Sequence, residues 1–77
     1  MPPTFEFKVD GENYSTLEHS LTPNQLLQIA GLDVPTHYLV EIKNKKQESL
    51  KDRMNEPIEI HQHMEFLSVY IGPTPVS

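Results

Sequence analysis

The chain of 77 residues contains no cysteine. Disulfides, thiolate metal sites and a cysteine nucleophile are therefore excluded, and the absence fits a reducing compartment. The chain also has no apolar run near the roughly 18 residues that a membrane-crossing helix requires. Residues 1–4 lead into no signal-peptide core. We therefore expect a cytoplasmic protein with no membrane partner.

Basic residues are scarce: six Lys and Arg stand against eleven Asp and Glu, which gives a formal charge of −5. A surface that binds nucleic acid needs positive charge, so we expect no nucleic-acid partner. Hydrophobic residues make up 36% of the chain, below the usual share of a globular domain. This length allows one small core but no deep substrate pocket besides, so we expect a protein that is not an enzyme.

The first segment with a clear pattern is a hairpin. Residues 5–9 alternate between apolar and polar, which predicts a half-buried strand. Asp10-Gly11 follows at once and predicts a tight turn, because glycine accepts the positive φ of such turns. The return strand covers about residues 13–18. A two-residue loop would place Tyr14 on the apolar face, whereas a longer bulged loop would turn Leu17 inward.

A helix is predicted next. Thr22-Pro23-Asn24-Gln25 has the pattern of an N-cap, a proline at the first helical position and a capping-box glutamine. Gly31 suits the left-handed position that closes a helix, with Leu32 folding back on Leu27. These signals predict a helix of about eight to ten residues.

Three more strands are predicted over residues 38–43, 58–61 and 65–71, and the polar residues 44–57 are expected to form a long crossing loop. The result is an α+β fold in which one helix covers a mixed sheet of about four to five strands. The residues expected to face the helix are Phe5, Phe7, Val9, Leu26, Leu27, Ala30, Val40, Ile42, Ile58, Ile60, Leu67, Val69 and Ile71.

The order of these elements (ββαββ) resembles the ubiquitin-like β-grasp fold. Four segments resemble the bacterial multiubiquitin family, namely Val9-Asp10-Gly11-Glu12-Asn13-Tyr14, Leu26-Leu27-Gln28-Ile29-Ala30-Gly31-Leu32, Tyr38-Leu39-Val40-Glu41 and Phe66-Leu67. The resemblance extends from about Phe5 to Ile71. It implies a single β-grasp domain over residues 1–72, followed by a flexible tail over residues 73–77 that a peptidase could remove.

What the resemblance implies is a bacterial ubiquitin-like protein modifier. Its partners would be an E1-like adenylating enzyme, an E2-like conjugating enzyme, a metal-dependent deubiquitinase-type peptidase and the target proteins. Such modifiers react through a C-terminal glycine carboxylate, which the E1 adenylates, holds as a thioester and passes on for attachment to an amine. The E1 supplies ATP and magnesium, so the modifier itself needs no cofactor. The alternatives are a β-grasp interaction module that is never conjugated, and a sulfur carrier.

Gly72 is the residue that corresponds to the reactive end. The chain has no terminal Gly-Gly pair, and the five residues Pro73-Thr74-Pro75-Val76-Ser77 follow Gly72. Conjugation would therefore require a peptidase to cut after Gly72. In the other interpretation, Gly72 and Pro73 only end the last strand, as glycine and proline often do.

A partner-binding surface is predicted on the sheet face that points away from the helix. If the odd-numbered residues of the last strand face the helix, Phe66 and Tyr70 face away from it, together with Leu39 of the neighbouring strand. Exposed aromatic and apolar side chains are enriched at interfaces, so Leu39, Phe66 and Tyr70 are the predicted contact residues. His61 and His63 are interpreted as exposed residues at a strand end, because metal sites normally need three or four ligands.

Overall fold

The computed structural model describes residues 4–71. Strands β1 (Phe5–Val9) and β2 (Glu12–Thr16) form an antiparallel hairpin. Asp10 and Gly11 have φ values of 54° and 83°, so the connection is the two-residue turn with positive φ at both positions. Tyr14 consequently lies opposite Phe7 on the buried side of the hairpin, as the two-residue alternative predicts.

Helix α1 (Pro23–Ile29) has the start signal and the closing turn that the sequence indicates. The Thr22 hydroxyl accepts a hydrogen bond from the Gln25 backbone N–H, and the Gln25 side chain accepts one from the Thr22 N–H, which confirms the capping box. The N–H groups of Gly31 and Leu32 donate to the carbonyls of Gln28 and Leu27, which is the Schellman closure. The helix has seven residues, fewer than predicted, because this closure takes up Ala30 and Gly31.

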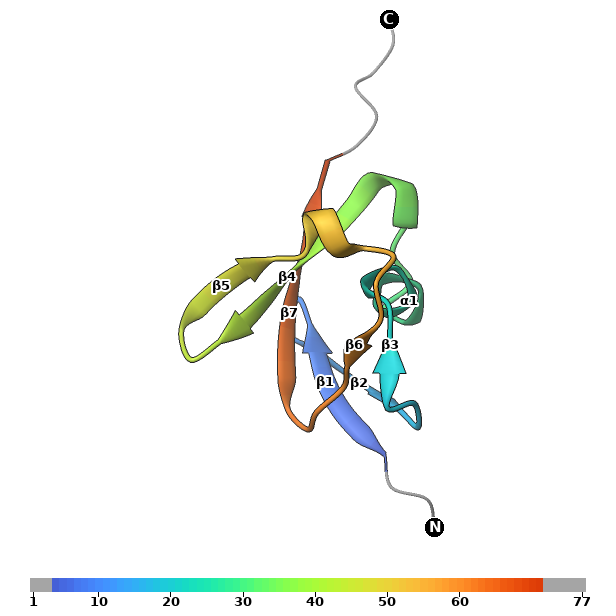
Figure 1. The fold of residues 1–77 in the computed structure, drawn as a ribbon, viewed down its shortest axis with the longest axis vertical. Coiled ribbons are helices and arrows are strands. Elements are labelled where there is room, and N and C mark those ends of the chain that lie inside the picture. The colour runs from blue at the N-terminus through green and yellow to red at the C-terminus, as the bar shows by residue number, and fades with distance from the viewer. Residues whose placement is uncertain (1–3, 72–77) are drawn as a thin grey trace, which may run out of the picture.

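The main sheet contains three further strands: β4 (His37–Lys43), β5 (Lys46–Ser49) and β7 (Met64–Tyr70). Its order is β2-β1-β7-β4-β5, and it is mixed because β1 and β7 run parallel while the other neighbours are antiparallel. The prediction of a crossing loop over residues 44–57 is wrong for its first part, because β5 pairs with β4 there. In Figure 1 the hairpin formed by β4 and β5 projects beyond the rest of the sheet.

The remaining elements are short. Two 3₁₀ turns lie at η1 (Val34–Thr36) and η2 (Lys51–Arg53). Strand β6 (Ile58–Glu59) pairs with β3 (Ser20–Leu21) in a separate two-stranded sheet. The predicted short fourth strand therefore exists, but it lies outside the main sheet.

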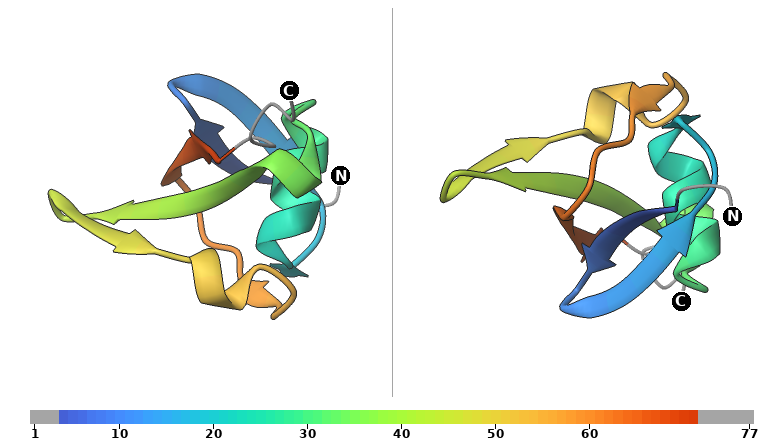
Figure 2. Two further views of the ribbon diagram at one scale, coloured as in Figure 1. Left: turned by 90° about the horizontal axis from the view of Figure 1, so that it is seen from above. Right: turned by 90° about the horizontal axis from the view of Figure 1, so that it is seen from below.

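The fold is α+β, with one helix packed on one face of a mixed five-stranded sheet. Figure 2 shows α1 beside the sheet from two opposite sides, with the β4–β5 hairpin extending away from it. We call the face that α1 covers the inner face and the opposite one the outer face. The buried core consists of Phe7, Val9, Leu21, Leu26, Leu27, Leu39, Leu50, Ile60 and Phe66.

The two faces of β4 and β7 are the reverse of the prediction. Leu39 and Phe66 are inner-face core residues with 0% and 1% exposure. Side chains alternate along a strand, so the residues next to them point outward. The predicted inward-facing residues that do not belong to the core or pack against it are Val40, Ile42, Leu67, Val69 and Ile71.

Candidate functional site: the outer face of the sheet

The outer face carries an apolar cluster on its two best-paired strands. Tyr38 lies opposite Val69 across the β4–β7 ladder, and Val40 lies opposite Leu67. Ile42 follows on the outer face of β4. All five side chains are partly exposed, and none of them packs against the core. We call Tyr38, Val40, Ile42, Leu67 and Val69 the outer patch.

The edge of the outer patch is polar and includes a positive charge. The Lys51 ammonium lies 5.5 Å from the centre of the Tyr38 ring, within the range of a cation–π contact. On β5, Ser49 and Gln47 lie opposite Val40 and Ile42. An apolar centre with a polar rim is the usual composition of a protein-binding surface.

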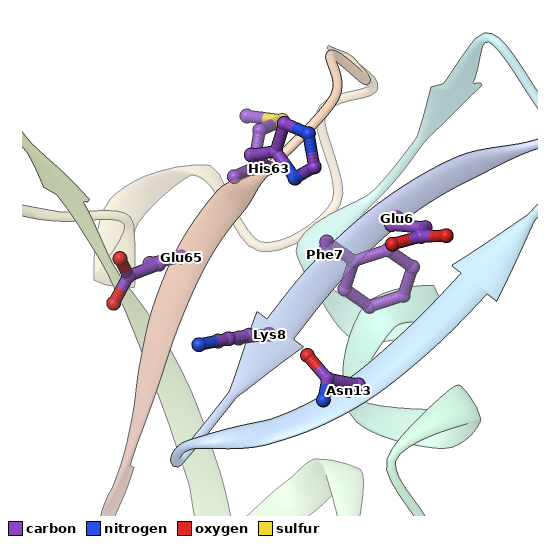
Figure 3. A pocket seen from close by; sticks show the side chains of 7 residues that line it. Glu6, Phe7, Lys8, Asn13, His63 and Glu65 are labelled. Carbon is purple, nitrogen blue, oxygen red and sulfur yellow. The ribbon is translucent and has the colours of Figure 1, made fainter.

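The other half of the outer face is polar. Lys8 of β1 lies opposite Asn13 of β2 on one side and Glu65 of β7 on the other. Figure 3 shows these side chains around a shallow pocket, which Glu6 and His63 also line. Charged and amide groups at these positions are well solvated, so this half of the face has no need of a partner.

The three residues predicted as the contact surface do not form one. Leu39 and Phe66 are in the core, where the Phe66 ring meets the Phe7 ring edge-on at a centroid distance of 6.3 Å. Tyr70 is 67% exposed, and its ring lies 5.3 Å from the His37 ring. The predicted patch is therefore wrong for Leu39 and Phe66, whereas Tyr70 is exposed but lies apart from them.

The reason for this error is visible in the two strands. β7 has apolar residues on both faces, so its pattern does not determine which face is buried. In β4 the polar Glu41 favoured the opposite orientation, but Glu41 is itself only 6% exposed. Leu39 shares the inner face with Glu41, and an alternating pattern that starts from Glu41 therefore assigns every residue to the wrong side.

The strand that carries two of the five outer-patch residues, Leu67 and Val69, also leads toward Gly72. β7 lies in the middle of the sheet, between β1 and β4. The Asp10 carboxylate accepts hydrogen bonds from the backbone N–H of Ser68, at 2.8 Å, and from its hydroxyl. The Ile71 N–H donates to the Thr36 carbonyl at 2.7 Å. The backbone is thus hydrogen-bonded as far as Ile71, and Gly72, the predicted conjugation end, lies outside the described residues.

Three other features concern metal binding, the segment around His61 and membrane spanning. Within residues 4–71, no group of three or more His, Asp or Glu side chains has an arrangement that could hold a metal ion. His61 lies 3.3 Å from Glu59, and the Gln62 side chain hydrogen-bonds the backbone of Thr4 and Glu6 at the start of β1. No helix in this part of the chain has the length and apolar character needed to cross a bilayer.

Comparisons with protein-family profiles, with curated proteins and with solved structures return no match for this chain.

Proposed function

We propose that this protein is a bacterial ubiquitin-like modifier with a β-grasp fold, related to the multiubiquitin family and conjugated through Gly72. Three features support the fold: a hairpin followed by the only helix described, the sheet order β2-β1-β7-β4-β5, and a central parallel pair of β1 and β7. A modifier of this kind is not an enzyme, works in the cytoplasm and leaves the chemistry to its partners.

The observation that carries the proposal is the position of β7. It is hydrogen-bonded to a strand on each side, and the Asp10 carboxylate bonds Ser68 from the turn of the first hairpin. A chain end that leaves a firmly held central strand can enter a narrow enzyme cleft without loosening the domain. Gly72 follows Ile71, whose N–H donates a backbone hydrogen bond to the Thr36 carbonyl just beyond β7. Because glycine has no side chain, its carboxylate would be accessible to adenylation by ATP, with release of pyrophosphate, and the acyl adenylate to attack by the E1 thiol, with release of AMP.

The outer patch would dock the E1-like enzyme. Leu67 and Val69 belong to the strand that ends at Tyr70, so an enzyme seated on the patch has the residues after Ile71 within reach. Burying five apolar side chains that do not contribute to the core would favour association without unfolding the modifier. The E2-like enzyme and the metal-dependent peptidase are expected to use the same face in turn.

The test is intact-mass measurement of the chain after incubation with a metal-dependent deubiquitinase-type peptidase and an E1-like enzyme of the multiubiquitin type, with ATP and magnesium. The expected result is loss of Pro73 to Ser77, followed by an ATP-dependent adduct on the E1 that a thiol reductant releases. Gly72→Ala should reduce this adduct strongly, because a side chain would then stand beside the reacting carboxylate.

The second candidate function is an interaction module that is never conjugated. It uses the outer patch in the same way, so binding alone does not separate the two. If residues 73–77 stay attached, no adduct forms, and Gly72→Ala behaves as the wild type, the modifier proposal fails and the interaction module remains.

A further inference from the structure

A second site lies on the inner side of the β4–β5 hairpin, beyond the part of the sheet that α1 covers. It is a pocket of about 280 Å³ between the hairpin, η2, β6 and the start of β7. Leu50, Ile58 and Met64 supply its apolar lining. Its charged lining consists of three carboxylates and two cationic side chains, together with His61; these are Glu41, Glu48, Glu59, Lys43 and Arg53. The net charge of the pocket is therefore negative when His61 is neutral.

One of these carboxylates, that of Glu41, is largely buried and has only a distant ion-pair partner. The Glu41 side chain is 8% exposed. Within residues 4–71 no side-chain oxygen is both fully buried and without a hydrogen bond, so the Glu41 oxygens keep some contact with solvent in the pocket. The nearest cation is the Lys43 ammonium, 3.8 Å from Glu41 Oε2, and the Lys43 side chain is 62% exposed. That separation exceeds hydrogen-bonding distance, so Lys43 compensates the charge only weakly.

The other charged groups of the pocket are already paired. Glu48, directly opposite Glu41 on β5, binds the Arg53 guanidinium at 2.6 Å. Glu59 lies 3.3 Å from His61. Burial, as the main cause, raises the pKa of the Glu41 carboxyl, and the Lys43 ammonium acts in the opposite direction. Glu41 is therefore the one carboxylate in this pocket that a further cation would stabilise most.

A buried carboxylate is costly unless a cation forms hydrogen bonds with it. We propose that this pocket binds an arginine side chain of a partner protein, with the guanidinium on the Glu41 carboxylate and the methylene stem on Leu50, Ile58 and Met64. Guanidinium is more weakly hydrated than ammonium and can bind a carboxylate through two parallel hydrogen bonds, which favours arginine in a half-enclosed site. Lys43 can turn away into solvent to admit it.

This site does not depend on conjugation. It lies on the opposite side of the hairpin from the outer patch, so a partner that contributes an arginine here would not compete for the patch. A failure at Gly72 leaves the pocket proposal intact, and the reverse also holds.

The experiment is an NMR titration of the whole chain with N-acetyl-arginine-N-methylamide, followed through the backbone amide signals. The neutral citrulline analogue, which has the same shape, is the ligand control. We expect saturable shifts centred on β4, β5 and β6 in the millimolar range, as befits a single side chain. The citrulline analogue should give no saturable shift.

Two variants test the role of the charge. Glu41→Gln should weaken arginine binding by about tenfold, because it removes the charged acceptor but keeps the shape. Lys43→Gln should strengthen binding several-fold, because it removes the competing ammonium. Glu65→Gln, which deletes the same charge from the outer face, is the matched control and should leave binding unchanged.

The proposal is overturned if arginine gives no saturable shift, or if citrulline binds as well. It is also overturned if Glu41→Gln and Glu65→Gln weaken binding equally, since binding would then follow net charge alone. The dispersion of the amide spectrum establishes that each variant is folded. Lys43→Gln is an independent check, because it must raise the affinity for arginine whereas Glu41→Gln lowers it.

Discussion

Leu39 and Val40 are neighbours in the chain, as are Phe66 and Leu67, yet the members of each pair have different surroundings. Leu39 and Phe66 lie in the core. Val40 and Leu67 lie opposite each other on the outer face, and neither packs against the core. A sheet with one helical layer needs only one apolar face. The second apolar face is therefore not explained by folding, and we propose that recognition of a partner accounts for it.

The outer face itself supplies a second contrast. Among residues 4–71, the apolar residues of its sheet strands lie on β4 and β7, while β1 and β2 present Lys8 and Asn13 beside Glu65. If the apolar residues were a general property of the sheet, they would continue onto β1. Their restriction to β7 and to its neighbour β4 is the reason why the proposed function assigns the outer patch to the enzyme that would act at Gly72.

The largest expected effect is on the inner face. Phe66→Ala should lower the free energy of unfolding by about 3–5 kcal/mol, because it removes a fully buried ring and leaves a cavity. Leu67→Ala, its neighbour, should cost only about 1 kcal/mol, since Leu67 is partly exposed. Urea unfolding of the two variants compares them directly. Equal losses would mean that the two faces do not differ as described.

A smaller effect is expected where the first hairpin holds β7. Asp10→Asn keeps a residue that tolerates the positive φ at this position but replaces the charged acceptor of the Ser68 bonds, and it should cost about 1 kcal/mol. Ser68→Ala should cost a similar amount. In the double variant the losses should not add, with a coupling of about 0.5–1 kcal/mol. Strict additivity would show that the Asp10–Ser68 contact does not stabilise the strand.

The smallest effect concerns Glu41, the polar exception on the inner face. Because burial raises the folded-state pKa of this carboxyl, the folded chain holds the proton to a higher pH than the unfolded chain. Its contribution to stability is therefore greatest below the unfolded pKa, near about 4.3, and falls as pH rises to the folded pKa. The Glu41→Gln variant lacks this carboxyl and should not lose stability in this way. The free energy of unfolding of Glu41→Gln minus that of the wild type should therefore increase as pH rises across this window and then level off.

Urea unfolding of the wild type and Glu41→Gln between about pH 4 and 7 measures this difference. The exposed Glu65→Gln serves as the control and should show no such trend. A difference that stays constant with pH, or that falls as pH rises, would contradict the assignment of Glu41 as a carboxylate destabilised by burial.

Local signals in the sequence predicted local structure well. The Thr22–Gln25 capping box, the Gly31 closure and the Asp10-Gly11 turn are each determined by a few adjacent residues, and all three are present. Strand β5 was missed because its four residues are polar and exposed, and only pairing with β4 orders them. Its turn at Asn44 and Lys45 has positive φ at both residues. Glycine is the usual residue at the second position of such a turn, so Lys45 did not indicate a hairpin.

The candidate site was harder to predict, for a physical reason. The sequence indicated that the outer face would carry apolar residues, but the choice between two alternating sets depends on which set meets α1. Phe66 is favoured inside by its contact with Phe7, a residue 59 positions away in the chain. The pattern of β7 alone does not determine which of its residues face α1. In β4 a polar residue, Glu41, is buried, so the polarity of the strand indicated the wrong residues as inward-facing.

The central claim is that the outer patch is a recognition surface which folding does not require. Its most direct test is the affinity of the E1-like enzyme for the wild type and for the double variant Val40→Thr/Leu67→Gln, measured by titration calorimetry. We expect the variant to stay folded, to lose about 1–2 kcal/mol of stability at most, and to bind at least about tenfold more weakly. Lys8→Gln, on the polar half of the same face, should bind as the wild type does. Unchanged affinity in a folded Val40→Thr/Leu67→Gln variant would contradict the claim.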